Sequence, residues 1–195
     1  TLPLPAVAKG EPMSQATHLQ VLEAIAGVAA QLPPGFPTQL DLLKARCRLL
    51  GAERFYAVEA GVASDLLLHY AECENHDGGS ASLQCRSGPS QRYMAAKTTR
   101  FWSLWSMQGE RLSLRDAGVD AQRLLGRGPW TGVDLNGDGR LDFFGLHQLR
   151  EWVGPGQLKS AVGDAALFSS GAGYTLGPRS VAPPPVLLWE PEPGC

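Results

Sequence analysis

The stretch RFYAVEAGVASDLLLHYAEC, residues 54–73, alternates apolar and polar side chains on both sides of a turn-like GVAS segment. Phe55 and Ala57 alternate before the turn, and Leu66 and Leu68 alternate after it. A period of two residues, interrupted by a turn signal, is typical of two antiparallel strands. The stretch therefore predicts a β-hairpin at the centre of the fold.

A second hairpin is expected downstream of the first. The segment RYMAAKTTRFWSLWSM is followed by a QG turn, and ERLSLRDAG after the turn offers a partner strand. Strand alternation places Phe101 and Trp105 on one face and Trp102 on the other. One face is expected in the core. The other either packs against a further layer or exposes aromatic side chains of the kind that binding surfaces favour.

Two helices are expected before this sheet. Apolar residues recur at helical spacing over 15–31, after a possible N-cap at Ser14. A second helix is expected between Thr38 and Gly51, with Cys47 on it. The predicted fold class is therefore α+β, with two N-terminal helices packed on an antiparallel sheet.

The remaining segments complete the expected organisation. Residues 1–13 hold prolines without periodicity and are expected as an extended arm before a single globular domain over 14–195. The LHQLREWV segment, 146–153, has apolar residues on one helical face, and a short helix is also expected within 120–128. The Gly- and Pro-rich stretch 154–195 is expected as an irregular tail with one extended segment, PPPVLLWEPEP.

Composition excludes several classes of protein. The net charge is −2 with a pI near 6.1, and no concentrated basic surface of the kind that binds nucleic acid is visible. No apolar run approaches the roughly 20 residues needed to span a bilayer. Hydrophobic residues make up 44% of the chain, with 23 glycines and 15 prolines. This composition is typical of a globular protein with many turns.

The four cysteines are Cys47, Cys73, Cys85 and Cys195. An even number among polar neighbours favours two disulfides over free thiols, and Cys73–Cys85 and Cys47–Cys195 are the expected pairs. The chain begins at Thr1 without a signal-like region, as a processed secretory protein or a trimmed chain would. The expected compartment is therefore extracellular or periplasmic.

The segment DLNGDGRLD has the spacing of a calcium-binding loop. Calcium takes six to eight oxygen ligands, and a tight loop supplies them when oxygen-bearing side chains alternate around a glycine. Gly139 is the glycine that allows the sharp reversal. The predicted Ca²⁺ ligands are Asp134, Asn136, Asp138, the backbone carbonyl of Arg140, and Asp142, directly or through a water.

Residues 134–145 resemble two families of calcium loops. The stretch is similar to EF-hand and dockerin-type loops through its ninth position, but Gly145 stands at the twelfth position, where an EF-hand has a bidentate Glu. It is also similar to the loops of FG-GAP repeats in integrin-like β-propellers, which link two strands and need no such Glu. Either resemblance implies a calcium loop alone. Without the Glu ligand, the ion is expected to be structural.

Catalytic chemistry has few candidates. His18 is expected to be solvated, His69 to be a satisfied structural residue in a strand, and His147 to lie at the surface or near the calcium loop. His76 and Asp77, in the segment CENHDGGS, form the one cluster with possible general-base chemistry. Neither a nucleophile elbow nor a zinc-ligand pattern is visible. The sequence therefore favours a protein that is not an enzyme.

The predicted function is that of a disulfide-containing, calcium-stabilised binding domain outside the cytoplasm. Its expected partner is another protein, including an enzyme that it inhibits, or a glycan. Two alternatives remain open. One is a calcium-dependent secreted hydrolase that acts on an extracellular polymer with CENHDGGS near its site. The other is a structural module of a larger assembly.

Overall fold

The structure is a computed structural model that describes most of the chain. Backbone is described for residues 8–59, 61–74, 81–84, 92–95, 98–120, 129–154, 157–176 and 186–189. Side chains are described for residues 8–58, 61–74, 99–119, 129–145 and 166–175.

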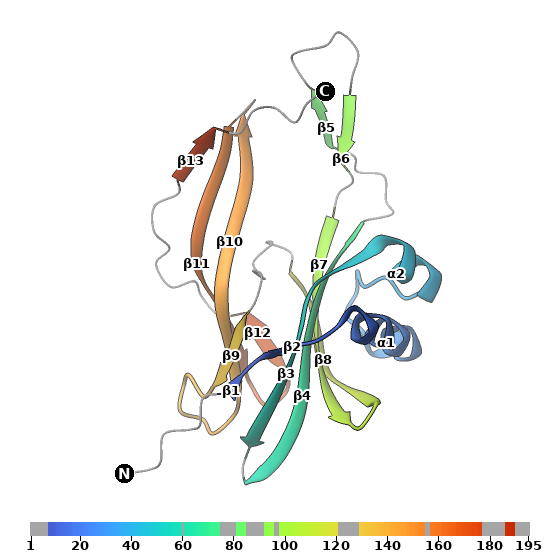
Figure 1. Ribbon diagram of the computed structural model, residues 1–195, viewed down its shortest axis with the longest axis vertical. Coiled ribbons are helices and arrows are strands. Elements are labelled where there is room, and N and C mark those ends of the chain that lie inside the picture. Colours follow the sequence, from blue (N-terminus) through green and yellow to red (C-terminus); the bar gives the residue numbers. More distant parts are fainter. Residues whose placement is uncertain are drawn as a thin grey trace.

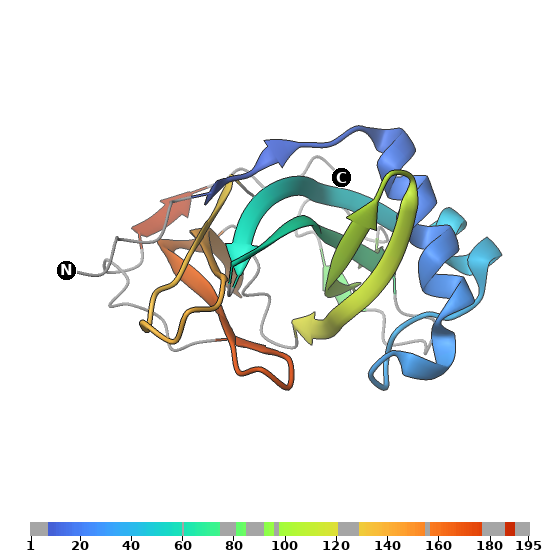
Figure 2. The same ribbon diagram turned by 90° about the horizontal axis from the view of Figure 1, so that it is seen from below.

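The described elements form three layers (Figure 1). A five-stranded antiparallel sheet, called the central sheet here, lies between two helices on one side and a six-stranded antiparallel sheet, called the outer sheet, on the other. Figure 2 shows the same order of layers from below. The fold is therefore mainly β, and the predicted α+β class is wrong.

The central sheet is built around the hairpin that the sequence predicts. Its strand order is β2-β3-β4-β7-β8, with all neighbours antiparallel. The hairpins β3–β4 and β7–β8 were both expected from alternation, and the structure confirms them. The strands are β2 (Glu11–Pro12), β3 (Cys47–Glu59), β4 (Val62–Glu74), β7 (Thr98–Gln108) and β8 (Arg111–Asp120).

The outer sheet has the order β1-β9-β10-β11-β12, and β13 also pairs with β11. Its long hairpin, β10–β11, pairs from Phe143↔Leu167 to Gly154↔Gln157. The strands are β1 (Ala8–Lys9), β9 (Trp130–Val133), β10 (Asp142–Gly154), β11 (Gln157–Ser169), β12 (Tyr174–Leu176) and β13 (Val186–Trp189), and a separate two-stranded sheet pairs β5 (Ala81–Gln84) with β6 (Arg92–Ala95).

The helical layer follows the expected order with shorter elements. Helix α1 spans Gln15–Gly27 and is followed by a short 3-10 helix, η1 (Ala29–Gln31), so the first predicted helix is confirmed. Helix α2 spans only Leu40–Arg46. The predicted continuation to Gly51 is wrong, because Cys47 already begins strand β3.

The N-terminal segment crosses from one sheet to the other at Gly10. Strand β1 pairs with β9 of the outer sheet, and β2 pairs with β3 of the central sheet. Between them, the backbone N–H of Gly10 donates a hydrogen bond to the carbonyl oxygen of Trp130 at 3.2 Å. A Cβ atom at Gly10 would lie 2.9 Å from the Phe55 ring, so the close approach of the two layers requires glycine here. The expected extended arm thus joins the two sheets from Ala8 onward.

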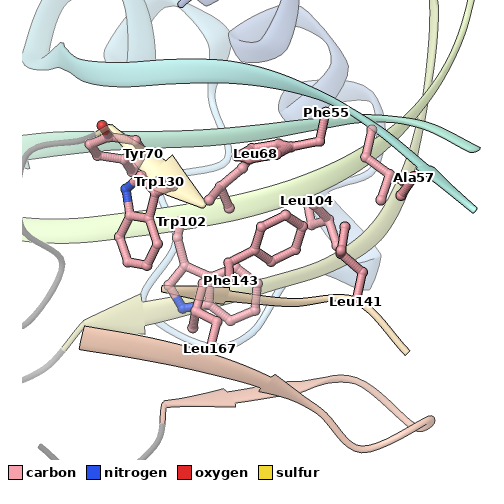
Figure 3. Packing of buried hydrophobic residues seen from close by; sticks show 11 residues of the cluster. Phe55, Ala57, Leu68, Tyr70, Trp102, Leu104, Trp130, Leu141, Phe143 and Leu167 are labelled. Atoms are coloured by element: carbon pink, nitrogen blue, oxygen red, sulfur yellow. The ribbon is translucent and has the colours of Figure 1, made fainter. Parts of the chain in front are cut away.

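The first of two cores lies between the sheets (Figure 3). Aromatic rings interlock across it, with Phe55 4.9 Å from Phe143 and Tyr70 6.1 Å from Trp130 between ring centroids. Such edge-on pairs stabilise a core by about 0.5–1.5 kcal/mol beyond the burial of their area. This inter-sheet core consists of Phe55, Ala57, Leu66, Leu68, Tyr70, Trp102, Leu104, Trp130, Leu141, Phe143 and Leu167.

The second core lies between the central sheet and the helices. Phe101 and Trp105 point into it, whereas Trp102 points into the inter-sheet core, as strand alternation predicts. All three are buried, so the alternative of an exposed aromatic face is wrong for this strand. This helix-sheet core consists of Val21, Leu22, Ile25, Phe36, Leu43, Ala52, Leu67, Cys73, Phe101, Trp105 and Ala117.

Two further expectations fail on the outer sheet. Residues 146–153, expected as a helix, lie within β10, and 157–176 of the expected irregular tail contains β11 and β12. Both failures have the same cause, because β10 and β11 pair along their length and long-range pairing overrides local preference. The extended segment near the C-terminus is confirmed as β13. The short helix expected in 120–128 falls outside the described residues after Asp120.

The disulfide links Cys47 to Cys73, which stand directly opposite one another on β3 and β4. The expected pairs Cys73–Cys85 and Cys47–Cys195 are therefore wrong. The error came from placing Cys47 on a helix, because only its position on β3 brings it beside Cys73. Cys85 and Cys195 lie outside the described residues.

Candidate functional site

The candidate calcium loop connects β9 to β10 and turns at two glycines. Gly137 and Gly139 have φ angles of 78° and 82°, a region that side chains with a Cβ atom rarely adopt. Asn136, Asp138 and the two glycines alternate in this turn. The turn points backbone N–H groups toward the acidic side chains of the loop. The predicted reversal at Gly139 is confirmed.

Asp134 organises the interior of the loop. Its Oδ1 accepts hydrogen bonds from the backbone N–H groups of Gly137 at 2.7 Å and Asp138 at 3.1 Å, and its Oδ2 accepts one from Gly139 at 2.7 Å. These bonds, first of all the one from Gly139, lower the pKa of the Asp134 carboxyl group. The carboxylate is therefore held ionised at the position where the first calcium ligand is predicted.

Asp142, the last of the predicted ligands, is fully buried. Its Oδ2 accepts a hydrogen bond from the N–H of Leu135 at 2.8 Å, and its Oδ1 accepts one from Ser169 at 2.7 Å. The side chain closes the loop and attaches it to the end of β11. Leu141 packs in the inter-sheet core, and its carbonyl oxygen accepts a hydrogen bond from the Tyr174 hydroxyl group at 2.9 Å.

Asn136 and Asp138 form the exposed rim of the loop. Asn136 Nδ2 donates to Asp138 Oδ2 at 3.4 Å, and Asp138 Oδ1 accepts a hydrogen bond from the N–H of Arg140 at 2.9 Å. The side-chain oxygens of Asp134, Asn136 and Asp138 are predicted ligands of a hard cation, together with the carbonyl oxygen of Arg140. Within the described ranges, no three His, Cys, Asp or Glu side chains form a ready-made metal cluster. Calcium binding remains a prediction from the spacing.

A pair of histidines lies inside the helix-sheet core. His18 on α1 and His69 on β4 are 1% and 2% exposed, and His18 Nδ1 lies 2.8 Å from His69 Nε2. The expectation that His18 is solvated is wrong, because the helix turns it toward the sheet. His69 is a satisfied structural histidine in a strand, as expected. Sequence spacing offered no signal for the pair, since its members are 51 residues apart.

A serine hydroxyl group lies beside the histidine pair, as in a catalytic Ser–His arrangement, but a substrate cannot reach it. Ser103 Oγ lies 3.5 Å from His69 Nδ1, but Ser103 is only 1% exposed. The cavity that His69 and Ser103 line has a volume of about 10 Å³. A volume of this size holds at most about one water molecule. The pair is therefore unable to receive a substrate. The other candidate cluster, His76 with Asp77, lies outside the described residues, as does the side chain of His147.

The most exposed of the large apolar side chains lie at the free end of the β3–β4 hairpin, with Tyr56 and Val58 on one face and Val62 on the other. Tyr56 is 58% exposed, Val58 73% and Val62 65%. Tyr56 and Val58 share the strand face that, further along, supports the helices, but α1 and α2 lie away from this end (Figure 1). Alternation predicted the strand correctly. Sequence reasoning missed the surface, because only the tertiary structure shows which part of a two-sided strand is left uncovered.

Arg54 fixes the orientation of this end of the hairpin. Its guanidinium group forms a two-fold ion pair with Asp65 on the neighbouring strand and lies 4.6 Å from the centroid of the Tyr56 ring. These contacts raise the pKa of Arg54, primarily through the hydrogen bond to Asp65. The ring of Tyr56 is therefore held in place on the exposed face.

The described elements define a β-sandwich of two sheets, in which the central sheet carries the disulfide and is covered by the helices. Searches against protein-family models, curated proteins and solved structures found no match for this chain. No helix among the described residues has the length and apolar character to cross a membrane.

Proposed function

We propose that this chain is a binding domain of an extracytoplasmic compartment that recognises another protein through the free end of the β3–β4 hairpin. The observation that carries the proposal is the exposure of Tyr56 and Val58, which lie two residues apart on the same face of β3. Val62, which is also exposed, lies on the opposite face of the hairpin. Grouped apolar side chains on a protein surface mark interaction sites, and aromatic residues contribute most to such interfaces.

The backbone at this end supports strand-to-strand recognition. Strand β2 pairs with β3 only at Glu53 and Arg54, and no other described strand is paired with the outer edge of β3 beyond them, where β1 passes near β3 on its way to the outer sheet. An open edge offers backbone donors and acceptors to a strand of a partner protein. A protein partner uses both features, because its backbone extends the sheet while its side chains cover Tyr56 and Val58.

Preorganisation also favours recognition at this surface. Binding costs less when the contacting side chains are ordered before the partner arrives. Arg54 holds the Tyr56 ring on the exposed face and is itself held by Asp65.

The compartment and the metal complete the proposal. The Cys47–Cys73 disulfide is expected to persist in an oxidising environment, which supports a secreted or periplasmic location. In this setting the 134–142 loop is proposed to bind calcium through Asp134, Asn136, Asp138 and the carbonyl of Arg140. A loop of this kind is expected to have a dissociation constant of about 10⁻⁵ to 10⁻³ M.

Binding is tested with a double variant and a control variant of the full chain. The readout is photo-crosslinking in the native compartment. The variant Tyr56→Ser with Val58→Ser is expected to lose the protein adducts that the wild type forms from a crosslinker at position 63, which is exposed and stands opposite Val58 on the same face. The control is Leu19→Ser, which removes an apolar side chain of 44% exposure from α1 and is expected to keep the adducts. Adducts that survive the hairpin variant and disappear in the control refute this surface. Retention on a polysaccharide column that the hairpin variant abolishes would assign the surface to a glycan.

Calcium is tested separately by thermal melting with calcium and with a chelator. The wild type is expected to melt at a higher temperature in calcium, and Asp138→Ala is expected to lose the difference. Asp41→Ala, which removes an acidic residue of α2, is the control. An unchanged melting temperature of the wild type in chelator eliminates the calcium site and leaves the recognition surface standing.

A further inference from the structure

Helix α1 docks on the central sheet through an apolar face that contains one buried polar contact. Val21, Leu22 and Ile25 of α1 are buried against the sheet. Among them, the His18 ring meets the His69 ring of β4, with the two ring planes only 12° apart. The contact therefore joins the helical layer to the central sheet.

Only one arrangement of protons satisfies every hydrogen bond of this contact. His18 Nε2 lies 3.4 Å from the carbonyl oxygen of Cys47, which can only accept, so this nitrogen carries a proton. His18 Nδ1 is then the acceptor for the N–H of His69 Nε2. His69 Nδ1 in turn accepts from the Ser103 hydroxyl group, whose oxygen accepts from the Trp105 indole N–H at 2.8 Å.

A proton added to His18 or His69 breaks this arrangement. A protonated imidazole donates from both nitrogens and accepts at neither, so two donors would face one another across the 2.8 Å contact. If the proton instead moves along the chain toward Ser103, one positive charge remains inside an apolar core. Burial lowers the pKa of His69 to about 3, with the charge of His18 as a second cause, and it also lowers the pKa of His18.

The charged groups on the surrounding elements are engaged elsewhere. Glu23 of α1 pairs with Lys44 of α2 at the surface. Glu72 of β4 pairs with Arg48 of β3 and Arg100 of β7. On β8, which also touches α1, Asp116 accepts hydrogen bonds from the N–H groups of Ala117 and Tyr174, and Arg115 is exposed. Among the residues that the structure describes, His18 is the charged partner that adds to the effect of burial in lowering the pKa of His69.

Acid has the opposite effect on the inter-sheet core. Glu53 is buried there, and burial raises the pKa of its carboxyl group, so this core gains stability as Glu53 becomes protonated. Acidification therefore weakens the contact between α1 and the central sheet while it strengthens the contact between the two sheets.

We propose that the His18–His69 contact is an acid-sensitive latch, whose protonation releases α1 from the central sheet while the two sheets stay together. Release uncovers the apolar surface that α1 covers, including Leu67 and Trp105. The Cys47–Cys73 disulfide keeps β3 attached to β4 in the open state. The latch is independent of the recognition surface proposed above, because it lies at the other end of the β3–β4 hairpin.

The test is hydrogen exchange with mass spectrometry on the full chain between pH 7.5 and 4, with rates corrected for the pH dependence of intrinsic exchange. Protection of Gln15–Gly27 is expected to fall below pH 6.5 by about tenfold per pH unit for each histidine that remains neutral in the docked state. Protection of β9 and β10 is expected to persist. Protection of α1 that stays constant to pH 4, or loss of α1 and β10 together, overturns the latch.

The variant His18→Leu with His69→Leu replaces both polar partners by apolar groups, which is expected to preserve docking. In it, protection of α1 is expected to be independent of pH, whereas His147→Leu is expected to behave as the wild type. Loss of α1 protection in the double variant with the wild-type pH dependence overturns the proposal. If the double variant does not fold, the histidine C–H signals of the wild type decide. Midpoints for His18 and His69 well below 6.5 support the latch, and midpoints at 6.5 with α1 docked refute it.

Discussion

Glu53 Oε2 accepts a hydrogen bond from the backbone N–H of Trp130 at 2.9 Å, and this bond joins the central sheet to the outer sheet. Glu53 is only 5% exposed, and burial raises the pKa of its carboxyl group, with the bond from Trp130 acting in the opposite direction. The carboxyl group that joins the two sheets therefore favours its neutral form in the folded protein.

The first prediction is that Glu53→Gln removes a pH dependence of stability. A carboxyl group with a raised pKa contributes stability below its unfolded value of 4.5, and the protein loses this stability as the pH rises through the folded value. The free energy of unfolding of the variant, relative to wild type, is therefore expected to increase as the pH rises above 4.5. Urea denaturation at a series of pH values measures the difference. A difference that does not vary between pH 4 and 8 contradicts the raised pKa.

Glu53→Ala is expected to behave differently, because it removes the acceptor together with the charge. The N–H of Trp130 is then left buried without its partner, which costs about 1–3 kcal/mol. Denaturation of the alanine and glutamine variants at the same pH isolates this loss, because neither side chain carries a charge. Equal stabilities of the alanine and glutamine variants at that pH would show that the hydrogen bond contributes little.

The second prediction concerns the Cys47–Cys73 disulfide. It closes a loop with a sequence separation of 26, so replacing both cysteines by serine is expected to lower the free energy of unfolding by about 3 kcal/mol. Digestion after Glu74 separates Cys73 from Cys85, and mass spectrometry of the unreduced digest then identifies the partner of Cys47. A fragment that links Cys47 to Cys85 or Cys195 would disprove the pairing.

The third prediction separates the structural acid of the loop from a ligand. Asp142→Ala leaves the N–H groups of Leu135 and Ser169 without their acceptor and is expected to destabilise the protein by about 1–3 kcal/mol, with calcium absent. Asp138 is exposed, so Asp138→Ala is expected to change stability only when calcium is present. Chemical denaturation in chelator compares the two variants. A loss in Asp138→Ala as large as in Asp142→Ala would contradict this division.

The fourth prediction uses two glycines that differ in the space around them. A Cβ atom at Gly118 would lie 2.5 Å from Trp102 Nε1, so Gly118→Ala is expected to displace the indole and cost about 1–3 kcal/mol. A Cβ atom at Gly27, in the last turn of α1, meets nothing within 4 Å. Gly27→Ala is expected to stabilise the helix by about 0.5–1 kcal/mol. A melting temperature of Gly118→Ala that equals or exceeds that of the wild type would refute the packing around Trp102, and a fall in Gly27→Ala would refute the open space at Gly27.

Some features of the candidate sites could be predicted from the sequence, and others could not. The loop was predictable because its oxygen-bearing residues and Gly139 lie within a few residues of one another, where local geometry decides. The burial of Asp142 could not be predicted, because its partner Ser169 belongs to another strand. The exposed surface at Tyr56 and the pair of His18 with His69 depend on which elements cover which, and the sequence carries no local signal for that.

The sequence alone determined the two central hairpins, the first helix and the turning loop, because alternation, helical spacing and glycine act over short distances. Only the tertiary structure decided that residues 146–153 form a strand and that Cys47 faces Cys73. In both cases backbone pairing with a distant segment outweighs the local preference. The physical reason is that helix periodicity is weak evidence for a segment whose hydrogen bonds are supplied by another strand.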